Sequence, residues 1–171
     1  MNPLLERLFP KPLDNDYRGH PLALWVFIPI TLLTLGRSLI HIFLADGGAQ
    51  SIATIPLDTM TRNGAAAVIL IFALWGLSQL LLGLLYLVVL WRYRALLPLM
   101  YVLLSVEYVG RFALGRWKPM ETLDTPPGAT GNYVLVALAV TMLALSLRPG
   151  RRADRELRRP RAGCRGQRPG T

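Results

Sequence analysis

Cysteine and histidine are almost missing from this chain of 171 residues. Cys164 is the only cysteine, which excludes an intramolecular disulfide and a site built from several thiolates. His20 and His41 are the only histidines, which argues against a histidine-rich metal or haem site. The HExxH, GxSxG, Walker and CxxC patterns of common enzymes are absent as well. We therefore expect neither a bound metal nor a cofactor, and no motif identifies an enzyme.

Charged residues are also scarce, at 17% of the chain, whereas hydrophobic residues make up 53%. The hydrophobic residues gather in four runs: Leu22–Leu44, Ala65–Leu90, Ala95–Leu114 and Gly131–Leu147. A helix needs about 20 apolar residues, within a range of roughly 17–25, to cross the hydrocarbon core of a bilayer. The first run is too long for the apolar core of a cleaved signal peptide, which has roughly 7–15 residues. The sequence therefore predicts an all-α integral membrane protein, a bundle of four transmembrane helices that occupies residues 22–147.

The distribution of the basic residues indicates how such a bundle would be oriented. Arg92 and Arg94 lie in the short turn between the second and third runs, and the segment 1–21 carries three further basic residues. The loops 45–64 and 115–130, by contrast, balance their basic residues with acidic ones. Because Lys and Arg accumulate in cytoplasmic loops, both termini are predicted in the cytoplasm and the two longer loops outside. We expect a multi-pass protein of the bacterial inner membrane.

The C-terminal tail, residues 148–171, holds nine Arg against Asp154 and Glu156, and so carries +7 of the net charge of +9. No aromatic residue separates these arginines, which argues against nucleic-acid binding. Rich in Pro, Gly and charge, the tail has little to bury and is predicted to be disordered. We expect it to be attracted to anionic lipid head groups. The arginines assigned to the membrane surface are Arg148, Arg151, Arg152, Arg155, Arg158 and Arg159.

Polar and aromatic residues inside the runs fall into one layer. The pairs are Arg37 and His41 in the first run, Trp75 and Gln79 in the second, and Glu107 and Arg111 in the third, with Tyr108 beside Glu107. Members of a pair are one helical turn apart and share a face. Counted from the cytoplasmic ends, the pairs lie at depths of roughly 16 to 28 Å. A charged residue at the centre of a membrane helix costs about 2.5–3.5 kcal/mol. We expect these residues to face inward and to line a ligand-binding cavity open to the outer side.

Small residues predict where the helices approach one another. Gly76 and Gly83 in the second run and Gly110 in the third permit close helix packing. The fourth run opens with Gly131–Asn132 and beyond them contributes only Thr141 and Ser146 to the polar positions inside the bundle, so we expect it to serve in packing.

Two stretches resemble the DoxX-like and related uncharacterised small four-helix membrane proteins of bacteria. One is YVGRFALGRW at Tyr108–Trp117, followed by a loop with prolines, and the other is WGLSQLLLGLLYL at Trp75–Leu87. The resemblance covers Leu22–Leu147. It implies a helical bundle and an association with redox or lipid partners, and it transfers no catalytic residue.

The predicted cavity leads to three function hypotheses. The preferred one is a binding or accessory protein that holds a lipid- or quinone-like ligand, with Arg37 and Arg111 on its polar head. The second is a membrane-embedded enzyme that acts on a lipid-like substrate with Glu107 or His41 as acid or base. The third is a small transporter or channel subunit, which requires a homo-oligomer or a membrane protein partner. A purely structural role for the buried ion pair is the competing interpretation.

Overall fold

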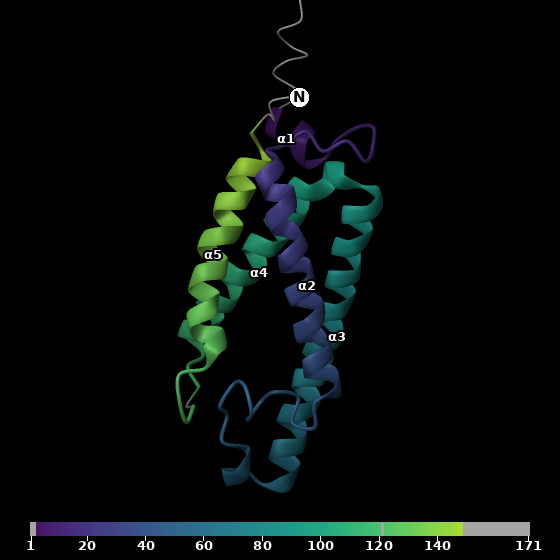
Figure 1. Cartoon of the computed structure of the whole chain (residues 1–171). Helices are drawn as coiled ribbons and strands as arrows, with labels where there is room; N and C mark the ends of the chain where they lie inside the picture. Colours follow the sequence, from purple (N-terminus) through teal and green to yellow (C-terminus); the bar gives the residue numbers. More distant parts are fainter. Residues whose placement is uncertain (1–2, 121, 149–171) are drawn as a thin grey trace, which may run out of the picture.

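The computed structural model of the chain describes residues 3–120 and 122–148, and within them every regular element is a helix (Figure 1). The elements are α1 (Pro3–Leu8), α2 (Pro21–Phe43), η1 (Leu57–Thr59), α3 (Arg62–Arg92), η2 (Arg94–Leu96), α4 (Leu97–Trp117) and α5 (Pro127–Ser146). The predicted all-α class is therefore confirmed. Of the arginines assigned to the tail surface, Arg148 is described and exposed, and the others lie outside the described residues.

Three helices are long and apolar enough to cross a membrane, namely α2, α3 and the segment Arg94–Trp117 that contains α4. This confirms that the first three hydrophobic runs form helices of membrane-spanning length and composition. The apolar part of α5, Thr130–Ser146, is shorter, so a fourth membrane crossing stays a prediction.

The helices begin where capping residues allow. Pro21 occupies the first turn of α2, and Nδ1 of His20 accepts a hydrogen bond from the backbone N–H of Leu22 at 3.2 Å. Thr61 caps α3 through its hydroxyl oxygen, which accepts the N–H of Gly64 at 3.2 Å. Because proline is well suited to the first helical position, α5 begins at Pro127 rather than at the predicted Gly131.

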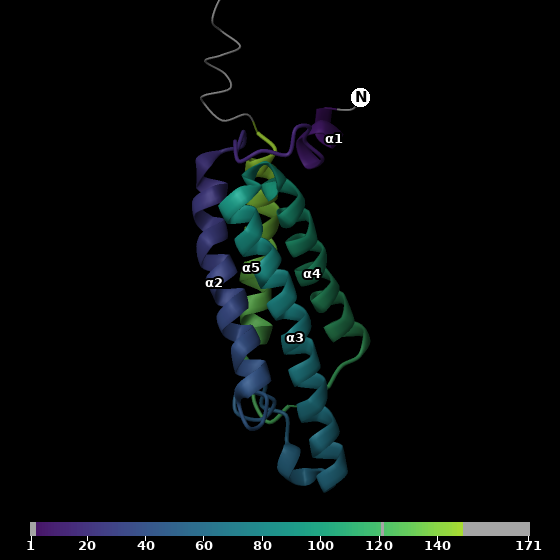
Figure 2. The same ribbon diagram turned by 90° about the vertical axis from the view of Figure 1, so that its right-hand side faces the viewer.

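The four long helices form two packed pairs (Figures 1 and 2). α2 packs along α3 and α4 along α5, while α2 also contacts α5. α3 and α4 contact each other little, although only a short turn joins them. α1, this turn and the C-terminal end of α5 lie at one end of the bundle, here called the turn end. The connections from α2 to α3 and from α4 to α5 lie at the other end, the loop end.

An aromatic core fills the half of the bundle nearer the turn end. The ring of Phe27 meets those of Tyr86 and Tyr101 edge-on, at centroid distances of 5.0 and 5.1 Å. The Tyr101 hydroxyl donates to the carbonyl oxygen of Ala23 at 2.7 Å. All four residues are fully buried. Edge-on aromatic pairs add to the stabilisation from area burial, so this half of the bundle is packed and closed.

Glycines bring α2 and α3 close together. A Cβ atom on Gly76 would lie 2.7 Å from Cβ of His41, and one on Gly83 would lie 2.7 Å from Cδ2 of Leu35. Both distances are shorter than any normal carbon–carbon contact. At Gly76 the neighbouring Cβ cannot move aside, so this position requires glycine, whereas the end of the Leu35 side chain beside Gly83 can move. A Cβ on Gly110 would meet nothing within 4 Å, and the prediction that Gly110 serves close packing is therefore wrong.

Candidate functional site

A chain of hydrogen bonds links three helices in the half of the bundle nearer the loop end. Nε and Nη2 of Arg37, on α2, donate to Oε1 of Gln79, on α3, at 3.1 and 2.7 Å. Nε2 of Gln79 donates to Oε1 of Glu107, on α4, at 2.6 Å. Glu107 also forms a salt bridge with Arg111, one turn further along α4. The chain therefore connects the pair α2–α3 to α4.

Gln79 is the central member of this chain and is 3% exposed. A guanidinium group only donates hydrogen bonds and a carboxylate only accepts them. The amide of Gln79 satisfies both neighbours, because its oxygen faces Arg37 and its nitrogen faces Glu107. This neutral residue therefore fixes the positions of a cation and an anion from two other helices.

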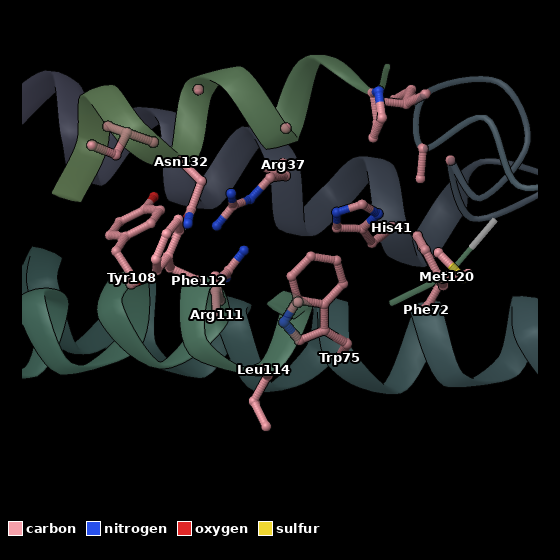
Figure 3. A pocket seen from close by; sticks show the side chains of 18 of the residues that line it. Arg37, His41, Phe72, Trp75, Tyr108, Arg111, Phe112, Leu114, Met120 and Asn132 are labelled. Carbon is pink, nitrogen blue, oxygen red and sulfur yellow. The ribbon is translucent and has the colours of Figure 1, made fainter. Parts of the chain in front are cut away.

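The ring of Trp75 lies against His41 and against both arginines, Arg37 and Arg111. Its ring lies 4.6 Å from that of His41, with an angle of 30° between the planes. The Cζ atoms of Arg111 and Arg37 lie 4.7 and 5.7 Å from the Trp75 ring centroid, within the range of cation–π contacts. Figure 3 shows the two guanidinium groups pointing toward each other from opposite walls.

His41 is held by the loop that follows α2. Its Nδ1 lies 2.7 Å from the carbonyl oxygen of Gly47, and the residue is 5% exposed. Gly47 and Gly48 have φ angles of +61° and +75°, a region that favours glycine, and these angles turn the chain back toward His41. Nε2, the other ring nitrogen, is buried without a partner among the described residues.

Asp46 organises this loop through its carboxylate. Its oxygens accept the backbone N–H groups of Gly48, Gln50 and Ser51 at 2.9, 3.1 and 2.7 Å. Partial burial, the largest single influence, raises the pKa of Asp46, but the hydrogen bonds together outweigh it and leave the pKa below its usual value. The ionised carboxylate therefore stabilises the turn that carries the Gly47 carbonyl.

A cavity of about 690 Å³ opens between the two helix pairs at this level. Arginine is its only charged lining residue among those described, at Arg37, Arg111 and Arg116. Aromatic side chains make much of the remaining wall: Phe72, Trp75, Tyr108, Phe112 and Tyr133. The volume lies within the range of small-molecule sites, roughly 300–1,000 Å³. The site thus combines an apolar wall with a strongly cationic one.

The two loops at the loop end are joined to each other over the cavity. The backbone N–H of Leu123 donates to the carbonyl oxygen of Thr54 at 2.9 Å. In turn, the Thr54 hydroxyl donates to the carbonyl oxygen of Asp124 at 2.8 Å. Ile52 and Met120, from the same loops, line the cavity. The loops therefore form part of its wall rather than a separate surface.

Five of the seven residues predicted for the cavity line it, namely Arg37, His41, Trp75, Tyr108 and Arg111. Gln79 and Glu107 are not among the lining residues and lie behind the wall, where they hold the two arginines. Helical spacing predicts that all seven side chains face the inside of the bundle. It does not predict which of them line the cavity and which lie behind its wall.

The sequence interpretation missed Asn132, Arg116 and Phe112, which also line the cavity. The expectation that the fourth run serves only in packing is wrong, because Asn132 lies on α5 inside the site. Nδ2 of Asn132 donates to the carbonyl oxygen of Tyr108 at 3.4 Å. The proline pair before Gly128 indicates an earlier helix start, which would have moved Asn132 from the helix end to an inward face.

Comparisons of the chain with protein-family models, with curated proteins and with solved structures find no match. The resemblance to DoxX-like proteins stays a prediction.

Proposed function

We propose that the chain is a four-helix bundle of the bacterial inner membrane whose cavity binds the head group of an anionic, amphipathic membrane ligand. The distribution of charge supports the orientation. Arg92 and Arg94 lie at the turn end, as do the basic residues of the N-terminal segment and Arg148, which favours a cytoplasmic turn end. The loop end, and with it the half of the bundle that contains the cavity, then lies toward the outer side.

The observation that carries the proposal is the charge of the cavity wall. Three arginines line it and no acidic residue among those described does. Glu107 balances one positive charge from behind, so the site keeps a net positive charge. Arg37 and Arg111 are half-buried, and positive charge held partly away from water is costly unless an anion compensates it. Guanidinium groups recognise phosphate and carboxylate with paired, directional hydrogen bonds, and such a group is therefore the expected ligand head.

The rest of the cavity suits the apolar part of the same ligand. Phe72, Phe112 and Tyr133 present aromatic surface, and Ile40 and Leu135 present aliphatic surface. A volume of about 690 Å³ holds a head group and the first part of an acyl or isoprenoid chain, but not a whole lipid. An uncharged quinone would use the arginines only as hydrogen-bond donors and would leave their charge uncompensated, so an anionic lipid fits better.

The position of Glu107 favours binding over acid–base catalysis by this residue. Its Oε1 accepts hydrogen bonds from both Gln79 and Arg111, and the side chain lies behind the wall. A carboxylate held in this way anchors the arginines and does not reach a ligand in the cavity.

Arg37→Gln tests the proposal, with Arg92→Gln as the matched control that removes the same charge at the turn end. Native mass spectrometry of gently extracted protein should show an anionic amphiphile on wild type and Arg92→Gln. Occupancy should fall at least about tenfold in Arg37→Gln, because a hydrogen bond to a charged group contributes about 1.5–3 kcal/mol.

Thermal unfolding of each variant shows whether it is folded. If Arg37→Gln is unstable, Arg116→Gln replaces it, because Arg116 lines the cavity on the exposed last turn of α4. Equal occupancy in wild type and in a folded Arg37→Gln protein would contradict the proposal.

A further inference from the structure

The segment before α2 carries large apolar side chains that remain exposed. Leu5, Phe9 and Leu13 are 49%, 57% and 56% exposed. Leu8 is half-buried and Pro10 is buried, so the segment packs against the bundle through these two and leaves the other three outside. Most other exposed apolar residues lie on helices of membrane-spanning length, where lipid tails would cover them. These three lie outside those helices, so their exposed surface requires a separate explanation.

The segment is attached to the bundle at several points along its length. Arg7 donates a hydrogen bond through Nη1 to the carbonyl oxygen of Leu147. The carbonyl oxygen of Asp14 accepts the backbone N–H of Ala95 at 3.4 Å. Tyr17 packs against the aromatic core. These contacts hold the segment across the turn end, so its exposed side chains have a defined place there.

The same contacts place the segment at the level where the long helices end. Ala95 lies in the turn directly after α3, and Leu147 follows the last residue of α5. The rings of Trp25 on α2 and Trp91 on α3 are 69% and 79% exposed near this end. Tryptophan is enriched at the interface between membrane and water. In a bilayer that α2 and α3 cross, the segment therefore lies at the level of the lipid head groups (Figures 1 and 2).

The charge at the turn end fits an anionic surface. Among the described residues of the segment 3–20, the turn 92–94 and Arg148, six are basic and three are acidic. Two of the acidic ones, Asp14 and Asp16, pair with Arg18 at 3.1 and 3.8 Å. Lys11, between Phe9 and Leu13, is exposed. Basic residues next to a membrane helix are attracted to anionic lipid head groups.

We propose that residues 3–13 lie in the surface of the bilayer at the turn end, with Leu5, Phe9 and Leu13 inserted between the head groups of anionic lipids. Insertion removes the apolar surface of these side chains from water, while Lys11 stays among the phosphate groups. This surface is separate from the cavity, and the proposal does not depend on what the cavity binds. A second copy of the chain is the alternative cover for the same side chains.

Spin labels on single cysteines test the proposal in the full chain with Cys164→Ser, in nanodiscs of phosphatidylglycerol and phosphatidylcholine. Labels at Phe9→Cys and Leu13→Cys should collide several-fold more often with oxygen, which dissolves in the bilayer, than with a water-soluble nickel complex. Leu81→Cys, at an exposed position in the middle of α3, is the reference for the lipid interior and should show the same preference. Asp16→Cys is the matched control in the same segment, because its side chain is 77% exposed, and its label should show the reverse preference.

Thermal unfolding shows whether each labelled protein is folded, and Leu5→Cys replaces Phe9→Cys or Leu13→Cys if either is not. Labels at these positions that behave like the label at Asp16 would overturn the proposal, because the side chains would then lie in water. Labels that are shielded from both reagents and broadened by a second label would also overturn it, because another copy of the chain would then cover the segment.

Discussion

At the scale of single residues, the site depends most on Gln79, a neutral side chain among charged ones. It hydrogen-bonds both Arg37 and Glu107. Its amide oxygen accepts from the guanidinium group, and its amide nitrogen donates to the carboxylate. Depth and helical spacing predict that Gln79 faces inward. They do not predict that it lies between a cation and an anion, because this depends on how two helices meet across α3.

Gln79→Leu keeps the size of the side chain and removes both ends of the amide. It should destabilise the protein by about 1–3 kcal/mol, since it removes the amide that accepts from the Arg37 guanidinium and leaves Glu107 with Arg111 alone. Thermal unfolding in detergent measures the effect. Ser78→Ala, at the adjacent outward-facing position, is the control and should shift the midpoint little. A midpoint for Gln79→Leu that matches wild type would show that the chain of hydrogen bonds contributes nothing.

His41 shows which side-chain roles cannot be predicted from spacing. Its position one turn after Arg37 places it on the correct face. The orientation of its ring depends on the carbonyl of Gly47, and so on a turn with two glycines in the left-handed region. The stretch Asp46–Gly48 signals a turn, but not that the turn folds back onto the helix before it.

At the scale of elements, the approach of α2 to α3 is the contact that glycine makes possible. Gly76→Ala would place a Cβ 2.7 Å from Cβ of His41 and should destabilise the protein by about 1–3 kcal/mol through overpacking. Gly110→Ala meets nothing within 4 Å and should stabilise α4 by about 0.5–1 kcal/mol, because alanine favours the helix. Unfolding midpoints of the two variants should therefore move in opposite directions. A shift in the same direction would contradict the packing of α2 on α3.

The loop after α2 should depend on pH through Asp46. Its pKa in the folded protein is lowered, so the stabilisation is complete above the usual Asp value of about 3.9 and is lost as pH falls through the folded value. Wild type should therefore lose stability below about pH 4. Asp46→Asn should lose less over the same range, although it is less stable at neutral pH. Unfolding midpoints at several pH values measure this, and equal slopes for the two proteins would exclude the role of Asp46.

The ends of the helices were predicted well where the hydrophobic run is long. They were predicted less well where a capping residue determines the first residue of the helix. The first run, Leu22–Leu44, matches α2 closely. α5 starts earlier than its hydrophobic run because Pro127 begins the helix in polar sequence. That extension is what brings Asn132 onto an inward face and into the cavity wall.

At the scale of the whole molecule, two features combine to make the site. The aromatic core closes the half nearer the turn end, while the two helix pairs leave a cavity between them nearer the loop end. The sequence predicted the membrane class and the layer of polar residues, because both follow from helix length and depth. It could not predict the loops that cover the cavity, since the bonds of Thr54 to Leu123 and Asp124 join segments far apart in the chain.

The most direct test of the central claim is a structure of the full chain in nanodiscs that contain an anionic lipid. The account predicts density for an anionic head group in contact with the guanidinium groups of Arg37 and Arg111, with its chain along Phe112 and Tyr133. A cavity that holds only water, or only the acyl chain of a neutral lipid, at saturating anionic lipid would contradict it.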